Sequence, residues 1–185
     1  SAWNVERVVD MTGMFTGASK LISSQKGKDI FYTWVRERGT NNNINALGDV
    51  LTSLELKDLS ELIKDHSDFN QDIGGWNVHQ VMDMNSMFNG ATVFNQNLSS
   101  WNVHKVTDMT SMFNVARAFN HNIGSWNVER VTDMNSMFQK AVQFNYNIGA
   151  WNVHDVGDMS SMFQEAEAFN QNIGDWNVHK VGSMS

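Results

Sequence analysis

The chain has 185 residues, a formal net charge of −7 and no cysteine. An acidic chain without a basic stripe is not expected to bind nucleic acid, and the lack of cysteine excludes disulfides and thiolate metal sites. No apolar run approaches the ~20 residues that a membrane-spanning helix needs.

The chain begins with a partial copy of a unit that recurs later every 25 residues. Residues 1–18 carry Trp3, Phe15 and Ala18 in the order of the later units. The phenylalanine expected three residues after Ala18 comes only at Phe69, so the spacing predicts an insert over residues 19–68. We expect the insert to enter and leave at a surface loop. We interpret both ends of the chain as cuts in a longer protein.

The insert is predicted to hold about three short helices. Apolar residues with helical spacing form three groups: Ile30, Phe31, Trp34 and Val35; Ile44, Leu47, Leu51 and Leu54; and Leu56, Leu59, Leu62 and Ile63. So small a bundle buries little surface, so it needs the repeats or a partner to cover its apolar side. Phe31, Trp34 and Val35 are therefore candidates for recruiting a partner. Residues 29–63 resemble the C-terminal helices of a death domain, which implies a role in signalling.

Residues 69–185 form an array of about 4.5 units of 25 residues, with tryptophan at positions 76, 101, 126, 151 and 176. A fixed period of this length is typical of a solenoid, in which each unit buries its apolar face on its neighbours. We predict an α/β solenoid with short parallel strands at Trp-Asn-Val and short helical or 3-10 turns.

The unit reads WNVxxVTDMxSMFxxAxxFNxNIG, and Leu98, Trp101, Val103 and Val106 follow the spacing of a leucine-rich repeat. This repeat sequence resembles that of the BspA-like leucine-rich surface proteins. The resemblance implies a right-handed coil, a bacterial or protist cell surface and a role in adhesion or recognition. The plain repeat of that family has no helical insert.

The apolar rows of the unit are predicted to form the core: tryptophan, both valines, isoleucine or leucine, methionine, alanine and phenylalanine. Two asparagine rows follow the phenylalanine row and are expected to form structural ladders at turns. One aspartate in each unit, as at Asp83 and Asp108, is expected to cap a short helical turn.

The exposed strand positions are predicted to form a polar stripe on the concave face. This Asn/His stripe consists of Asn77, His79, Asn102, His104, Asn127, Glu129, Asn152, His154, Asn177 and His179. Three interpretations remain open: a solvated row without a ligand, a surface that recognises a protein or glycan, and a metal site formed by His104, Glu129 and His154. Protonation of the histidines would add like charges in line, so we expect binding to weaken or switch in mild acid.

The rows contain no nucleophile with an adjacent base and no paired carboxylates, so we expect neither enzymatic activity nor a cofactor. The favoured hypothesis is a binding or adhesion module that uses the Asn/His stripe. One alternative is an intracellular scaffold or receptor fragment that recruits a partner through the insert. Another is a structural protein whose copies associate end to end.

Overall fold

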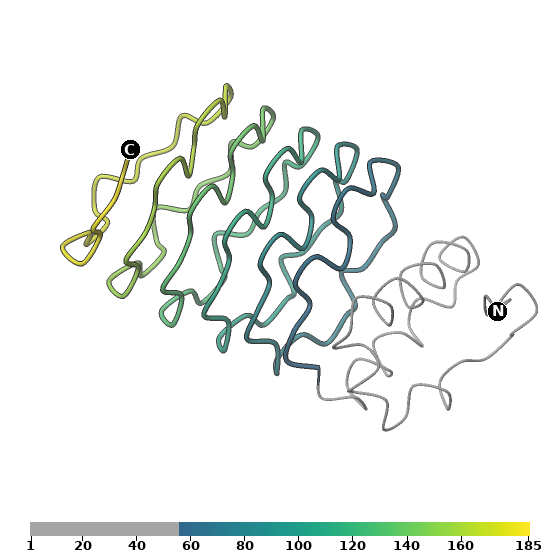
Figure 1. The fold of residues 1–185 in the computed structure, drawn as a ribbon, viewed down its shortest axis with the longest axis horizontal. Helices are drawn as coiled ribbons and strands as arrows, with labels where there is room; N and C mark the ends of the chain where they lie inside the picture. Colours follow the sequence, from purple (N-terminus) through teal and green to yellow (C-terminus); the bar gives the residue numbers. More distant parts are fainter. Residues whose placement is uncertain (1–55) are drawn as a thin grey trace, which may run out of the picture.

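The computed structural model describes residues 56–185. The chain winds in successive turns of 25 residues, and these turns stack along one direction (Figure 1). No α-helix or extended strand forms within residues 56–185. The backbone register is set by single parallel bridges, which join Asp58 to Asp83, Asp83 to Asp108, Asp108 to Asp133, Asp133 to Asp158, and Asp158 to Ser183. The partial repeat at 1–18, the first two predicted helices and Phe31, Trp34 and Val35 lie outside the described residues.

The strands predicted at Trp-Asn-Val are not present in the described turns, where the bridges lie at the aspartate row instead. The physical reason is a tight turn directly after the Trp-Asn-Val segment. The N–H of Val106 donates to the carbonyl of Val103 at 2.9 Å, so the chain changes direction before a strand can extend.

Between the methionine and alanine rows, tight turns replace the predicted helical segments. Alternate N–H groups bond in two directions. Those of Ser86 and Phe88 donate to carbonyls of the following turn at 2.8 and 2.9 Å, whereas the N–H of Met87 donates within its own turn to Met84. A helix would direct all of these groups along itself. Ser86 adopts the left-handed region, with φ of 54°, which allows this alternation.

Residues 56–68 belong to the coil, although the sequence predicted a third helix of the insert there. Asp58 bridges Asp83, and Leu59 donates its N–H to the Asp83 carbonyl at 2.9 Å. Leu62 and Ile63 are buried where the following turn has Met87 and Phe88. The spacing of these leucines is common to a helix and to this turn, which explains the different outcome. The array therefore begins before Phe69.

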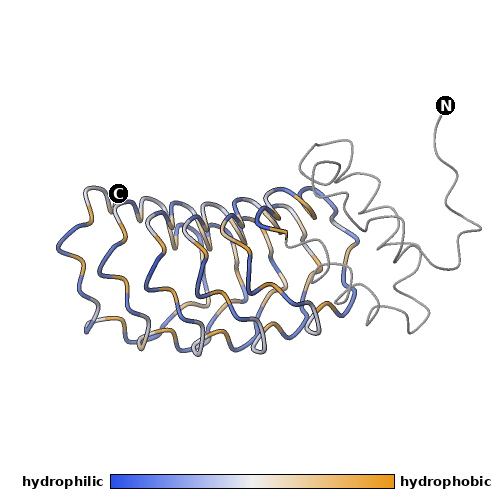
Figure 2. Cartoon of the chain, turned by 90° about the horizontal axis from the view of Figure 1, so that it is seen from below, coloured by the Kyte–Doolittle hydropathy of each residue, from blue (hydrophilic) through white to orange (hydrophobic). Residues whose placement is uncertain are grey.

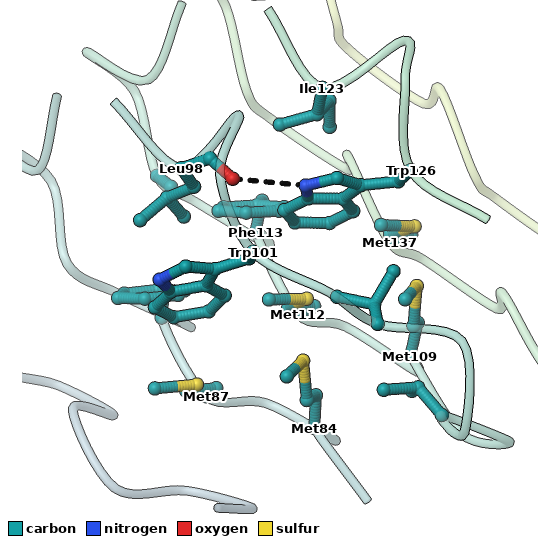
Figure 3. Packing of buried hydrophobic residues seen from close by; sticks show 14 of the residues in the cluster. Met84, Met87, Leu98, Trp101, Met109, Met112, Phe113, Ile123, Trp126 and Met137 are labelled. Carbon is teal, nitrogen blue, oxygen red and sulfur yellow. Dashed lines mark hydrogen bonds between the residues drawn. The ribbon is translucent and has the colours of Figure 1, made fainter. Parts of the chain in front are cut away.

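The core consists of continuous columns of identical side chains. The Trp101 and Trp126 rings stack at 6.4 Å with an interplanar angle of 5°, and both side chains are buried. The indole N–H of Trp126 donates to the carbonyl of Leu98 at 3.0 Å, as Figure 3 shows. Burial of one such aromatic side chain contributes roughly 1.5–3 kcal/mol, so these columns dominate the stability of the coil.

The columns differ in the spacing of their rings. The rings of Phe113 and Phe138 are 5.7 Å apart, and those of Trp101 and Trp126 are 6.4 Å apart. Figure 2 shows the successive turns side by side along the coil. The edge of the coil that carries the bridged aspartates is referred to as the inner edge.

Candidate functional site

The Asn/His stripe lies at a corner of the coil, between the tryptophan and the aspartate of each turn. Each histidine, or Glu129 in the third unit, directly follows the valine of Trp-Asn-Val. It therefore lies within the tight turn that runs from this valine to the next one, as from Val103 to Val106. The stripe asparagines are exposed in all five units. The stripe is therefore accessible, and a tight turn rather than a strand holds it in the described units.

The side chains of the stripe asparagines brace this corner. Asn127 Oδ1 accepts the N–H of Glu129 at 3.1 Å, and Asn152 Oδ1 accepts that of His154 at 3.3 Å. Asn77, Asn102 and Asn177 make the same contact two residues ahead. Because a backbone N–H can only donate, the oxygen of each amide must face the chain. The backbone N–H that it accepts thus fixes the orientation of each amide group.

The histidine rings are oriented by neighbouring oxygens. Nδ1 of His104 and Nδ1 of His179 each lie 2.8 Å from the asparagine oxygen two residues before, and His79 makes the same contact with Asn77. His154 instead contacts Asp155 Oδ1 at 2.8 Å. An amide or carboxylate oxygen can only accept, so Nδ1 is the donor in these contacts, and in a neutral ring the lone pair is then on Nε2.

A row of charged residues runs beside the histidines and was not singled out from the sequence. It contains Gln80, Lys105, Arg130, Asp155 and Lys180, the residues that directly follow the His/Glu positions. Lys105 Nζ donates to Gln80 Oε1 and Lys180 Nζ to Asp155 Oδ1, each at 2.6 Å. A hydrogen bond from the Lys180 ammonium is the main cause that holds the pKa of Asp155 below its ordinary value of 3.8, and the contact with His154 is the second cause. The signal available in the sequence was the charged residue at four of these five positions.

The aspartates of the inner edge shape the backbone rather than cap a helix. Asp108 Oδ1 accepts the N–H of Thr110 at 2.8 Å, and Asp158 Oδ1 accepts that of Ser160 at 2.7 Å. Hydrogen bonds from the hydroxyl and then the N–H of Ser160 lower the pKa of Asp158 from 3.8. The same contact recurs at Asp58, Asp83 and Asp133, so these aspartates have a structural role in each turn that carries one.

The two remaining asparagine rows both bond to the backbone, and the first of them forms the ladder between turns that the sequence predicted. Asn120 Oδ1 accepts the N–H of Asn145 in the following turn at 3.1 Å, and Asn145 Oδ1 accepts that of Asn170 at 2.9 Å. In the second row, Asn97 Oδ1 and Asn147 Oδ1 accept the N–H groups two residues ahead. One row joins neighbouring turns, and the other closes the turn that precedes each tryptophan.

Three further properties of the described part concern metal ions, cavities and membrane-spanning helices. Residues 56–185 contain no group of three or more His, Cys, Asp or Glu side chains that could hold a metal ion, so His104, Glu129 and His154 are not brought together as ligands. A cavity of about 420 Å³ at the last turn is lined mainly by apolar side chains, among them Met162, Phe163 and Trp176. In the part of the chain that is described, no helix could cross a membrane.

Comparison with known proteins identifies a family without an assigned activity. No curated protein and no solved structure matches the chain. One family model, described as "Mycoplasma protein of unknown function, DUF285", matches residues 1–30, 35–131 and 119–185. These segments cover most of the insert as well as the repeats, and on this match the chain belongs to the DUF285 family of repeat proteins.

Proposed function

We propose that this chain is a non-enzymatic recognition module that binds a protein or glycan partner through the Asn/His stripe. The observation that supports this proposal is the bracing of the stripe. Each exposed asparagine is held by a backbone N–H, and each histidine ring is oriented by an oxygen. A surface ordered before binding loses less conformational entropy when it binds.

The resemblance of the repeat sequence to that of the BspA-like proteins supports the same proposal. We propose that the DUF285 repeat is a leucine-rich-repeat-like solenoid and that the chain acts in adhesion at a cell surface. Solenoids provide long binding surfaces because each unit adds an equivalent patch to the next. In residues 56–185 this patch is one exposed asparagine with its neighbouring His/Glu position.

The test is capture of partners by the immobilised chain from a glycan array and from a set of purified surface proteins. The double variant His104→Ala and His154→Ala should lose the captured partner and keep the thermal stability of the parent, because both side chains are partly exposed. The matched control is Gln143→Ala with Glu167→Ala, which alters two exposed residues away from the stripe. Capture that survives the histidine changes would show that the stripe is not the site.

A further inference from the structure

The orientation of the amides gives the Asn/His stripe a defined hydrogen-bonding character. The oxygen of each stripe asparagine accepts the backbone N–H two residues ahead, and in three units it also faces a histidine Nδ1. An amide group has acceptors only on oxygen, so the NH₂ group remains to face a ligand. The stripe therefore presents one amide donor from every described unit, and these donors lie in line.

Charge is also divided between the two edges of the coil. The row beside the histidines contributes Lys105, Arg130 and Lys180, opposed only by Asp155 in that row and by Glu129 in the stripe. Three cations against two anions leave this edge slightly positive on a chain whose formal charge is −7. The inner edge instead has an aspartate in nearly every turn. A ligand with carboxylates is thus favoured at the stripe and repelled by the inner edge.

We infer that the partner of the stripe is an acidic protein segment rich in Asp and Glu. The inference rests on the proposed use of the stripe for recognition. Ionised carboxylates accept hydrogen bonds and donate none, which matches a row of amide donors. The hydroxyls of a neutral glycan donate as well as accept, so they match a row of donors less well.

The experiment measures binding of a labelled poly-L-aspartate peptide to the whole chain. A Gly-Ser peptide of equal length serves as the neutral ligand, and a polyuronate serves as the carbohydrate ligand. We expect the aspartate peptide to bind, the Gly-Ser peptide not to bind, and the affinity for the aspartate peptide to fall in added salt. Circular dichroism checks that the chain stays folded under each condition.

The decisive variant is Asn102→Asp with Asn152→Asp. Aspartate keeps the oxygen that each turn needs and replaces the donor with an acceptor, so the fold should persist while affinity falls about tenfold or more. The matched control is Asn97→Asp with Asn147→Asp, which makes the same chemical change in the turns at Ser99 and Gly149. It adds the same charge away from the stripe, so it should retain most of the affinity.

The outcomes separate this inference from the proposed function. Equal losses in both pairs would mean that only net charge matters, and binding confined to the polyuronate would make the partner a carbohydrate; either result overturns the inference. If the peptide fails to bind, although another partner is captured through His104 and His154, the inference fails and the proposed function stands.

Discussion

The indole of Trp126 offers a direct test of how neighbouring turns are held together. Its N–H donates to the Leu98 carbonyl at 3.0 Å, and the side chain is 4% exposed. Trp126→Phe removes this bond and reduces the buried apolar area. The Leu98 carbonyl keeps a second bond, from the N–H of Trp101 at 3.1 Å, so no buried acceptor is left without a partner.

The expected cost follows from these contacts. Loss of the hydrogen bond should lower the free energy of unfolding by about 1 kcal/mol, and the smaller ring should remove about another 1 kcal/mol of apolar burial. We therefore expect Trp126→Phe to destabilise the chain by about 2 kcal/mol. The control is Trp176→Phe, because Trp176 makes the same bond to Ile148 at 3.2 Å but is only partly buried. Its replacement should cost about 1 kcal/mol or less.

The measurement is urea unfolding followed by far-UV circular dichroism, which does not depend on tryptophan emission. The dependence of the unfolding free energy on urea should stay constant, so that the shift in midpoint reports stability. Equal costs for Trp126→Phe and Trp176→Phe would refute the reasoning, because burial would then make no difference. A cost for Trp126→Phe that is too small to measure would refute it as well.

Two further predictions concern single positions. Val115 adopts a left-handed backbone with φ of 59°, at the position that Gly90 occupies in the preceding turn. Because this region is strained for a β-branched residue, Val115→Gly should raise the free energy of unfolding by about 1 kcal/mol in the same assay. A lower free energy of unfolding in this variant would contradict the strain. Asp158 has a lowered pKa, so its ionised form should stabilise the chain above its ordinary value of 3.8, and this contribution should be lost as pH falls through the lower pKa of the folded state. Asp158→Asn should therefore reduce the fall in melting temperature between about pH 5 and about pH 2, and an unchanged fall would exclude this role.

The sequence predicted the interior well because apolar identity repeats at fixed positions. Trp126, Met134 and Phe144 recur in register, and all three are buried. The ladder through Asn120 and Asn145 was likewise predicted from asparagine next to phenylalanine. Side chains that recur every 25 residues must meet their own equivalents when the turns stack, so register alone determines these contacts.

Local backbone conformation was harder to predict. Leu59, Leu62 and Ile63 have the spacing of a helix, but they bury the same face when consecutive tight turns replace it. Alternation around Val103 suggested a strand, whereas the bond from Val106 to Val103 closes a turn. Both patterns record which residues point inward, and this is common to several backbone paths. The direction of each N–H group cannot be deduced from them.

The stripe was predicted as an exposed row, and its residues are exposed or partly exposed in the described turns. The sequence did not predict which atoms face outward. That depends on the bond from Asn102 Oδ1 to the N–H of His104 and on the contact of His104 Nδ1 with the same oxygen. Lys105 and Lys180 were also not included, because their role depends on a corner whose geometry the alternation did not reveal.

Each junction between turns is formed by hydrogen bonds in both directions. Ser86 and Phe88 donate their N–H groups to carbonyls of the following turn, whereas Thr107 donates back to the carbonyl of Met82 at 2.8 Å. Both turns therefore contribute donors and acceptors at fixed positions. Gain or loss of one complete 25-residue unit recreates the same junction, whereas a partial unit would shift donors out of register with their acceptors. Such a molecule can change its length during evolution in whole units without redesign of its cross-section.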